Sequence, residues 1–133
     1  MDIKQPFNLF QWIEKNRHLL KPPVGNKNLY VDAGDYIVMI VAGPNARKDY
    51  HYNETEELFF QLEGEIIVKT QQNNKCVEIP IKAGEMFLLP AKIPHSPSRS
   101  ENSIGLVIER VRKGSDMKDG LMWFCDTCNH PLF

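Results

Sequence analysis

The chain has 133 residues, the length of one domain with a single hydrophobic core. Its 16 Lys and Arg residues nearly balance its 17 Asp and Glu residues, and a formal net charge of -1 argues against a nucleic-acid surface or a polybasic membrane face. The longest apolar run, from Tyr36, is too short to span a bilayer, and the N-terminus lacks the layout of a signal peptide. Because three cysteines are too few for a disulfide scaffold, we expect a reduced protein of the cytoplasm.

One helix is predicted, close to the N-terminus. Asn8 can cap it, and it should end before Pro22 and Pro23. Short β-type runs follow it near residue 28 and at 36–42, 57–62, 65–70, 76–81, 85–90, 104–111 and 121–124. Turn-forming residues separate these runs at spacings of about ten residues, so the sequence predicts an all-β sandwich or barrel.

The segment YHYNETEELFFQLEG at 50–64 places His51 shortly before Glu54, Glu56 and Glu57. Glu57 opens an apolar run, so a strand would hold it in place, whereas Glu54 and Glu56 are expected to be solvated. Six extended residues span about 20 Å, so the chain must turn between His51 and Glu57 if both bind one metal ion. The alternative is a solvated acidic loop without a metal.

A second histidine ligand should lie on another strand, and His95 is the candidate. It follows an apolar run and stands near Pro94 and Pro97, which stiffen the backbone, so we expect a rigid turn there. Two histidines and one carboxylate on one face leave three positions of a ferrous ion open for substrate and oxygen. The alternative is that His95 has a structural role and binds no metal.

The two segments resemble the two motifs of the cupin superfamily, in which glycines and a proline mark the turns around three histidines and a glutamate. Gly64, Gly84 and Pro90 fall on those turn positions. Asn53 stands where many cupins have a second histidine, and Lys92 stands where the second motif usually has glycine. The resemblance implies a cupin double-stranded β-helix, a jelly-roll barrel, with a short N-terminal helix. It implies three Fe(2+) ligands: His51, Glu57 and His95.

Flanking segments narrow the resemblance to the 3-hydroxyanthranilate 3,4-dioxygenases: residues 18–29, 43–64, 87–100 and 106–112. That family implies Fe(II)-dependent, extradiol-type cleavage of 3-hydroxyanthranilate by O2 to 2-amino-3-carboxymuconate semialdehyde. The product closes to quinolinate, in NAD biosynthesis from tryptophan through kynurenine. The family also implies a homodimer. A non-catalytic cupin that binds a small aromatic acid is the alternative, and a sugar isomerase or epimerase is disfavoured because Asn53 removes one ligand.

Such a substrate carries a carboxylate, an amine and a hydroxyl on one ring. Arginine forks bind carboxylates, and Glu109 is a costly carboxylate in an apolar run unless it faces a polar cavity. The resemblance implies that Arg99 pairs with the substrate carboxylate, Glu109 meets the amine or hydroxyl, and Arg47 lies near the oxygen; these are the expected catalytic residues. It adds Asn26 and Glu57 to the substrate pocket. The alternative places the arginines on the surface and pairs Glu109 with a neighbouring arginine.

We divide the chain into a cupin catalytic domain with the N-terminal helix, residues 1–115, and a C-terminal extension, residues 116–133. The extension carries Cys125 and Cys128 in C-x-x-C spacing, half of a four-thiolate knuckle. Members of the family that the chain resembles carry a second such pair. A second Fe or Zn at Cys125 and Cys128 would therefore need ligands from outside this chain. We expect a truncated C-terminus; metal binding with His130 and an outside ligand, and a metal-free vestige, are the alternatives.

Overall fold

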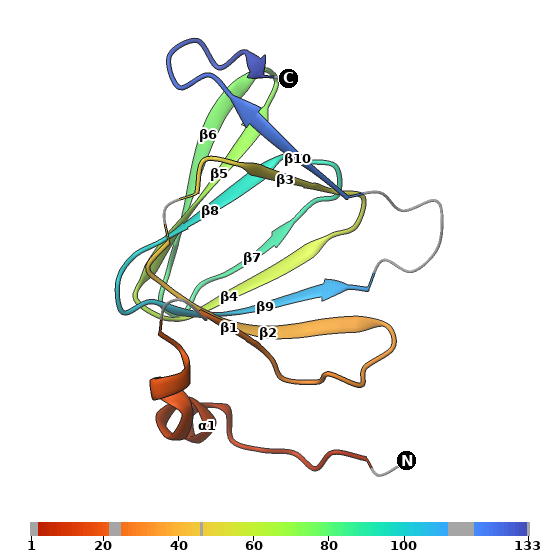
Figure 1. Ribbon diagram of the computed structural model, residues 1–133, viewed down its shortest axis with the longest axis vertical. Helices are drawn as coiled ribbons and strands as arrows, with labels where there is room; N and C mark the ends of the chain where they lie inside the picture. Colours follow the sequence, from red (N-terminus) through yellow and green to blue (C-terminus); the bar gives the residue numbers. More distant parts are fainter. Residues whose placement is uncertain (1–2, 22–24, 46, 112–118, 133) are drawn as a thin grey trace.

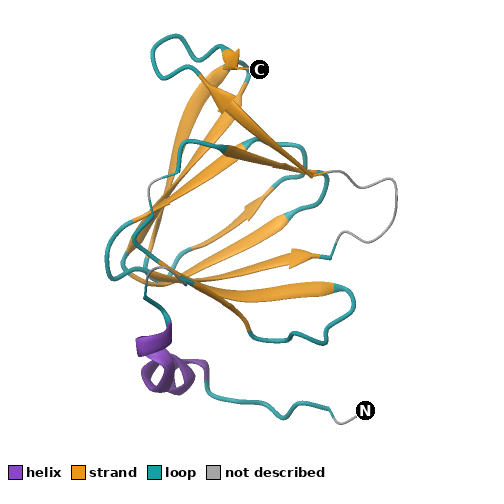
Figure 2. Ribbon diagram, in the orientation of Figure 1, coloured by secondary structure: helices purple, strands orange, loops and turns teal. Residues whose placement is uncertain are grey.

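The computed structural model describes residues 3–21, 25–45, 47–111 and 119–132. Two antiparallel β-sheets face each other, and one short helix lies beside the N-terminal strands (Figure 1, Figure 2). In sheet order, the first sheet contains β1 (Asn26–Asn28), β2 (Tyr36–Ala42), β9 (Ile104–Arg110), β4 (Glu57–Glu63) and β7 (Met86–Leu89). The second contains β11 (Pro131–Leu132), β10 (Asp119–Phe124), β3 (Tyr50–Asn53), β8 (His95–Arg99), β5 (Glu65–Gln72) and β6 (Lys75–Lys82).

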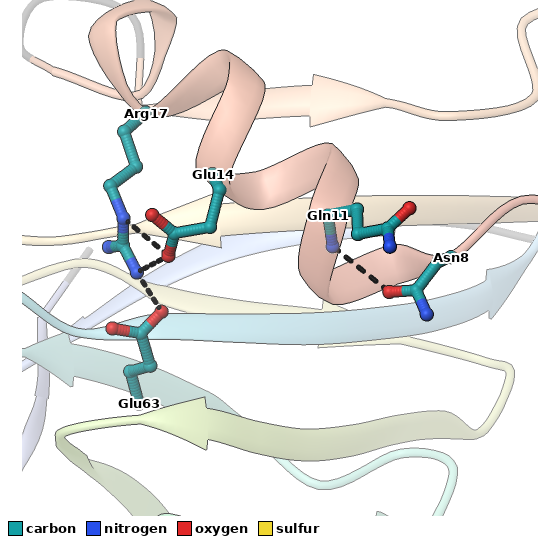
Figure 3. A network of polar contacts seen from close by, with 5 residues as sticks. All are labelled: Asn8, Gln11, Glu14, Arg17 and Glu63. Atoms are coloured by element: carbon teal, nitrogen blue, oxygen red, sulfur yellow. Dashed lines mark hydrogen bonds and ion pairs between the residues drawn. The ribbon is translucent and has the colours of Figure 1, made fainter.

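The helix α1 (Leu9–Asn16) begins where the sequence predicts. The Asn8 side chain accepts a hydrogen bond from the Gln11 N–H at 3.0 Å, which satisfies one otherwise unpaired donor of the first turn. A 3₁₀ turn follows, and Arg17 in it reaches Glu14 at 2.6 Å and Glu63, at the end of β4, at 2.7 Å (Figure 3). The helix ends at Asn16 and the 3₁₀ turn at Leu19, before Pro22 and Pro23 as expected; the two prolines themselves lie outside the described residues. α1 is therefore tied to the first sheet by both charge and apolar packing.

Both faces of the first sheet are covered, which explains the continuous apolar run of β2. Ile40 and Ala42 pack in a cluster with Ile13 of α1, whereas the alternate residues Met39 and Val41 pack toward the second sheet. A second cluster lies between the sheets: Phe59, Ile66, Val68, Ile81, Leu89 and Val107. The all-β prediction is confirmed.

Three strands were not expected: β3, β8 and the two-residue β11. The first two carry the candidate histidine ligands. β3 contains His51, and β8 begins at His95, so the prediction of a rigid turn at His95 is wrong. β8 pairs with β5 over its whole length, which extends its backbone. Its pairing with β3 is confined to His51 and His95, so the missing N–H of Pro97 costs no described ladder bond to β3.

The C-terminal segment joins the second sheet. β10 pairs with β3 from Asp119 opposite Asn53 to Met122 opposite Tyr50, and β11 pairs with β10. The expected boundary between residues 115 and 116 lies outside the described residues. Within the described ranges, no helix is long and apolar enough to cross a membrane.

Candidate functional site

A cavity of about 700 Å³ lies between the two sheets. Met39, Val41, Phe59 and Val107 supply part of its apolar wall. Every residue that the sequence nominated for the iron or the substrate lines it: Asn26, Arg47, His51, Glu57, His95, Arg99 and Glu109. The structure therefore brings together seven residues that are spread over more than eighty positions of the chain.

Cross-strand pairing places four of these side chains. His51 of β3 lies opposite His95 of β8 in the second sheet. Glu57, the first residue of β4, lies opposite Glu109 of β9 in the first sheet. The chain turns between β3 and β4, as the spacing required, so one cross-strand pair from each sheet faces the cavity.

The imidazole of His95 is held by contacts at both ring nitrogens. Its Nδ1 lies 3.0 Å from the Ile93 carbonyl oxygen, and its Nε2 lies 3.1 Å from Glu57 Oε2. The His51 ring centroid is 5.9 Å from that of His95, and His51 Nε2 is buried with no hydrogen-bond partner among the described residues. As the described side chains stand, no group of three or more His, Cys, Asp or Glu is arranged to hold a metal ion.

The donor set nevertheless fits a divalent metal. Two ligands about 2.1 Å from one ion and at right angles to each other lie about 3 Å apart, close to the separation of His95 Nε2 from Glu57 Oε2. The Ile93 carbonyl beside His95 Nδ1 is the usual partner of a metal-binding histidine, because it directs the Nε2 lone pair away from itself. His51 Nε2 is a buried nitrogen that a metal ion would satisfy.

Electrostatics favour the forms that bind metals. Burial acts to raise the pKa of Glu57, but hydrogen bonds with His95 and Glu109 outweigh it and lower the pKa to about 2. Burial, followed by the positive charge of Arg47, lowers the pKa of His51. Near neutral pH, Glu57 is thus a carboxylate and His51 a neutral imidazole, as coordination requires.

The two nominated arginines occupy different environments. Arg99, at the end of β8, is 6% exposed, and its Nη1 has no hydrogen-bond partner among the described residues. Burial lowers the pKa of Arg99 to about 10, against the opposing charge of Glu57, so it remains a cation at neutral pH. Arg47 is 39% exposed at the rim and forms an ion pair with Asp49. A buried, unsatisfied guanidinium donor is costly, and an anionic ligand would satisfy it.

The three clustered glutamates lie in different environments. Glu57 is buried and lines the cavity, whereas Glu56 is exposed and Glu54 is half-buried. Glu54 and Glu56 border a separate, shallower hollow beside Ala91. Of the three, only Glu57 is in reach of the histidines.

The two departures from the cupin motifs meet at one turn. Lys92 has φ of +64°, the left-handed region that favours glycine, and its N–H donates to the Asn53 carbonyl oxygen at 2.8 Å. Asn53 is buried and lines the cavity beside His51. The turn keeps the backbone shape of the motif although its residue is a lysine.

The cavity residues that sequence reasoning did not nominate include Asn45, Gly120 and Leu121. Asn45 follows a Gly-Pro pair, which is typical of a turn, and its signal is that Asn side chains in turns often bind nearby backbone. Gly120 and Leu121 belong to β10, and nothing in their residue types signals a pocket. Their position depends on the pairing of β10 with β3.

Cys125 and Cys128 lie in the turn between β10 and β11 and do not line the cavity. Hydrogen bonds from the backbone of Cys128 and Thr127, together with the Cys128 thiol, lower the pKa of the Cys125 thiol. The turn is held against the β5–β6 hairpin by a side-chain pair, Gln71 with Asn129, at 2.7 and 2.9 Å. A metal at the two thiols stays a prediction.

Solved structures of low sequence identity share the fold. A cupin-2 domain protein from Shewanella frigidimarina aligns with 75% of this chain and 92% of its own, with a TM-score of 0.58 and 19% identity. A putative sugar phosphate isomerase from Acidithiobacillus ferrooxidans aligns with 74% of this chain and 68% of its own, with a TM-score of 0.57 and 18% identity. The predicted cupin fold is confirmed.

Sequence relatives are much closer. A 3-hydroxyanthranilate 3,4-dioxygenase of Xanthomonas oryzae pv. oryzae is 59% identical over 128 residues, which cover 96% of this chain and 71% of the relative. The enzyme of the same name from Bacillus thuringiensis is 46% identical over 130 residues, with the same coverage. The sequence model described as 3-hydroxyanthranilic acid dioxygenase matches residues 1–133. The chain therefore belongs to the 3-hydroxyanthranilic acid dioxygenase family.

Proposed function

We propose that the protein is a ferrous-iron dioxygenase that opens the aromatic ring of 3-hydroxyanthranilate in the extradiol manner. Both atoms of O2 enter the product, 2-amino-3-carboxymuconate semialdehyde, a precursor of quinolinate and NAD. The observation that carries the proposal is one cavity with two buried, unsatisfied groups of different kinds, His51 Nε2 and Arg99 Nη1. One suits a metal ion and the other an anion, and the substrate is an anion that can chelate a metal.

His51, Glu57 and His95 would hold the iron. Ferrous iron supplies Lewis-acid binding of the substrate amine and hydroxyl and one-electron chemistry with dioxygen. Three protein ligands leave coordination positions for both the substrate and dioxygen. His95 is aligned by its contact with the Ile93 carbonyl, and His51 needs only a side-chain adjustment because its Nε2 has no competing partner among the described residues.

The remaining cavity residues would orient the substrate. Arg99 binds the ring carboxylate, and Glu109, opposite Glu57, meets the amine and hydroxyl and accepts the hydroxyl proton when it is ionised. Arg47 would lie near the oxygen, and Asn26 would close part of the wall; both residues line the cavity. The apolar side chains around them exclude water from the ring, which strengthens these charged contacts.

The test is oxygen uptake after anaerobic loading with ferrous iron and addition of 3-hydroxyanthranilate and air. We expect oxygen consumption and formation of the muconate semialdehyde, lost in Glu57→Ala and kept in Glu56→Ala, the matched control outside the cavity. Iron-loaded protein that binds 3-hydroxyanthranilate without consuming oxygen would contradict the proposal. That outcome would favour the alternative, a non-catalytic cupin that binds a small aromatic acid.

We also propose a homodimer in the cytoplasm. The three cysteines are unbridged, as in a reducing compartment. Light scattering on the purified protein is expected to give twice the chain mass of 15.4 kDa, and a monomer at micromolar concentration would contradict the dimer.

A further inference from the structure

The buried guanidinium of Arg99 is placed by a residue that is remote from it in sequence. The Arg99 backbone N–H donates to Asn45 Oδ1 at 2.7 Å, and the Asn45 N–H donates to the Arg99 carbonyl oxygen at 3.1 Å. Asn45 thus satisfies both backbone groups of Arg99, as a neighbouring strand would. No strand occupies this position, because the described pairing between β3 and β8 ends at His95.

The neighbouring glycine makes this close approach possible. A Cβ on Gly43 would lie 2.2 Å from the Ser100 carbonyl oxygen and 3.0 Å from Arg99 Cβ. The Gly43 N–H also donates to the Ser103 carbonyl oxygen at 3.0 Å, so the segment is held at Ser103 as well as at Arg99. The contact between Asn45 and Arg99 is therefore supported by the close packing of the segment around it.

Space around the Arg99 side chain is equally restricted. A Cβ on Gly105 would lie 3.3 Å from Arg99 Nη1 and 2.7 Å from Gln61 Oε1, and Gln61 is fully buried. The side chain therefore has little freedom to compensate if its backbone moves. A shift at the backbone of residue 99 is transmitted to the guanidinium.

We propose that Asn45 is a positioning residue for Arg99, and through it sets the preference of the cavity for ligands that carry a ring carboxylate. Asn45 acts on the backbone of Arg99, and Arg99 touches the carboxylate. The inference rests on the proposed function, because it names the carboxylate of that substrate.

The experiment compares two ligands that differ only in the carboxylate: 3-hydroxyanthranilate and 2-aminophenol. Binding is measured by calorimetry on ferrous-loaded protein under nitrogen, where no turnover occurs. Because Arg99 would meet the carboxylate through charge-assisted hydrogen bonds, which are roughly twice as strong as neutral ones, a misplaced guanidinium in Asn45→Ala should weaken 3-hydroxyanthranilate binding on the order of tenfold. Binding of 2-aminophenol should change by less than about twofold, since that ligand does not use Arg99.

Two further variants separate positioning from general damage. Asn28→Ala removes a comparable bond, from the Tyr30 N–H to an Asn side chain at 3.0 Å, outside the cavity lining, and should leave the ratio of the two affinities unchanged. In an Arg99→Ala background, Asn45→Ala should have no further effect on that ratio, because the group it positions is gone. If Asn45→Ala does not fold, Asn45→Ser replaces it, because its shorter side chain withdraws the acceptor.

Equal weakening of both ligands by Asn45→Ala would overturn the inference, as would unchanged binding of 3-hydroxyanthranilate. An effect that persists in the Arg99→Ala background would overturn it as well. A wild-type protein that binds neither ligand would refute the proposed function and the inference with it. Binding without oxygen uptake would refute only the catalytic part of the proposed function.

Discussion

The two faces of the first sheet are built from alternate residues of the same strands but have opposite chemistry. Under α1, Ile40 and Ala42 lie in a closed apolar cluster. On the face toward the second sheet, Glu57 and Glu109 border a cavity that also contains a buried arginine. Apolar burial stabilises the first face, whereas the second retains buried polar groups that are costly without a ligand. The comparison predicts that stability and chemistry respond to different mutations.

The largest effect is expected on the cavity face, from His51→Ala. Iron affinity and oxygen uptake should fall by more than the roughly 10–100-fold that follows loss of an outer-shell partner, because a ligand itself would be lost. The urea midpoint should stay the same or rise slightly, since His51 Nε2 has no partner to lose among the described residues. His18→Ala, in the 3₁₀ turn, is the matched control and should keep both iron and activity. Full iron content in His51→Ala would remove His51 from the ligand set.

Ile40→Ala tests the apolar face. Its side chain is fully buried, and truncation of such residues costs about 2–5 kcal/mol of unfolding free energy. The ligand affinities of the protein that remains folded should not change, because Ile40 does not line the cavity. Urea denaturation measures the loss of unfolding free energy. The control is Leu88→Ala: this side chain is 54% exposed, so its truncation should change the unfolding free energy by less than about 0.5 kcal/mol. A selective change in ligand affinity in Ile40→Ala would contradict the prediction that stability and ligand binding depend on different faces of the sheet.

The smallest effect is expected from Arg17→Ala, which cuts the polar link between α1 and β4. Arg17 bridges Glu14 and Glu63, but these side chains are largely exposed, and such pairs contribute about 0.2–1 kcal/mol (Figure 3). The difference in unfolding free energy between Arg17→Ala and the wild type should shrink in about 1 M salt, where screening of the charges is strong. A loss of several kcal/mol would mean that charge, rather than the Ile13 cluster, attaches the helix.

Sequence patterns predicted the elements whose signals are local. Asn8 caps the helix as its residue type suggests. Asn73 and Asn74, both at positive φ, form the tight turn between β5 and β6 that QQNNK indicated. In both cases the asparagines that form the cap or the turn are also the residues from which it is predicted.

Prediction was weakest where pairing overrides local preference. HSPSR contains two serines and a proline, so its propensity is that of a turn, yet β5 pairs with it residue by residue. Lys92 likewise adopts a glycine-like φ because its N–H is bound by Asn53. Gly120 and Leu121 reach the cavity only because β10 adds to β3.

The sequence by itself determined the all-β class, the helix, and the residue types able to bind a metal and an aromatic acid, because periodicity, caps and motif spacing are properties of the chain. The tertiary structure alone decided which of them meet. The pairing of β3 with β8 and of β4 with β9 sets His51 against His95 and Glu57 against Glu109, and the double contact with Asn45 fixes the backbone of Arg99. These contacts join residues that are distant in the chain, and their geometry follows from the packing of two sheets rather than from any local pattern.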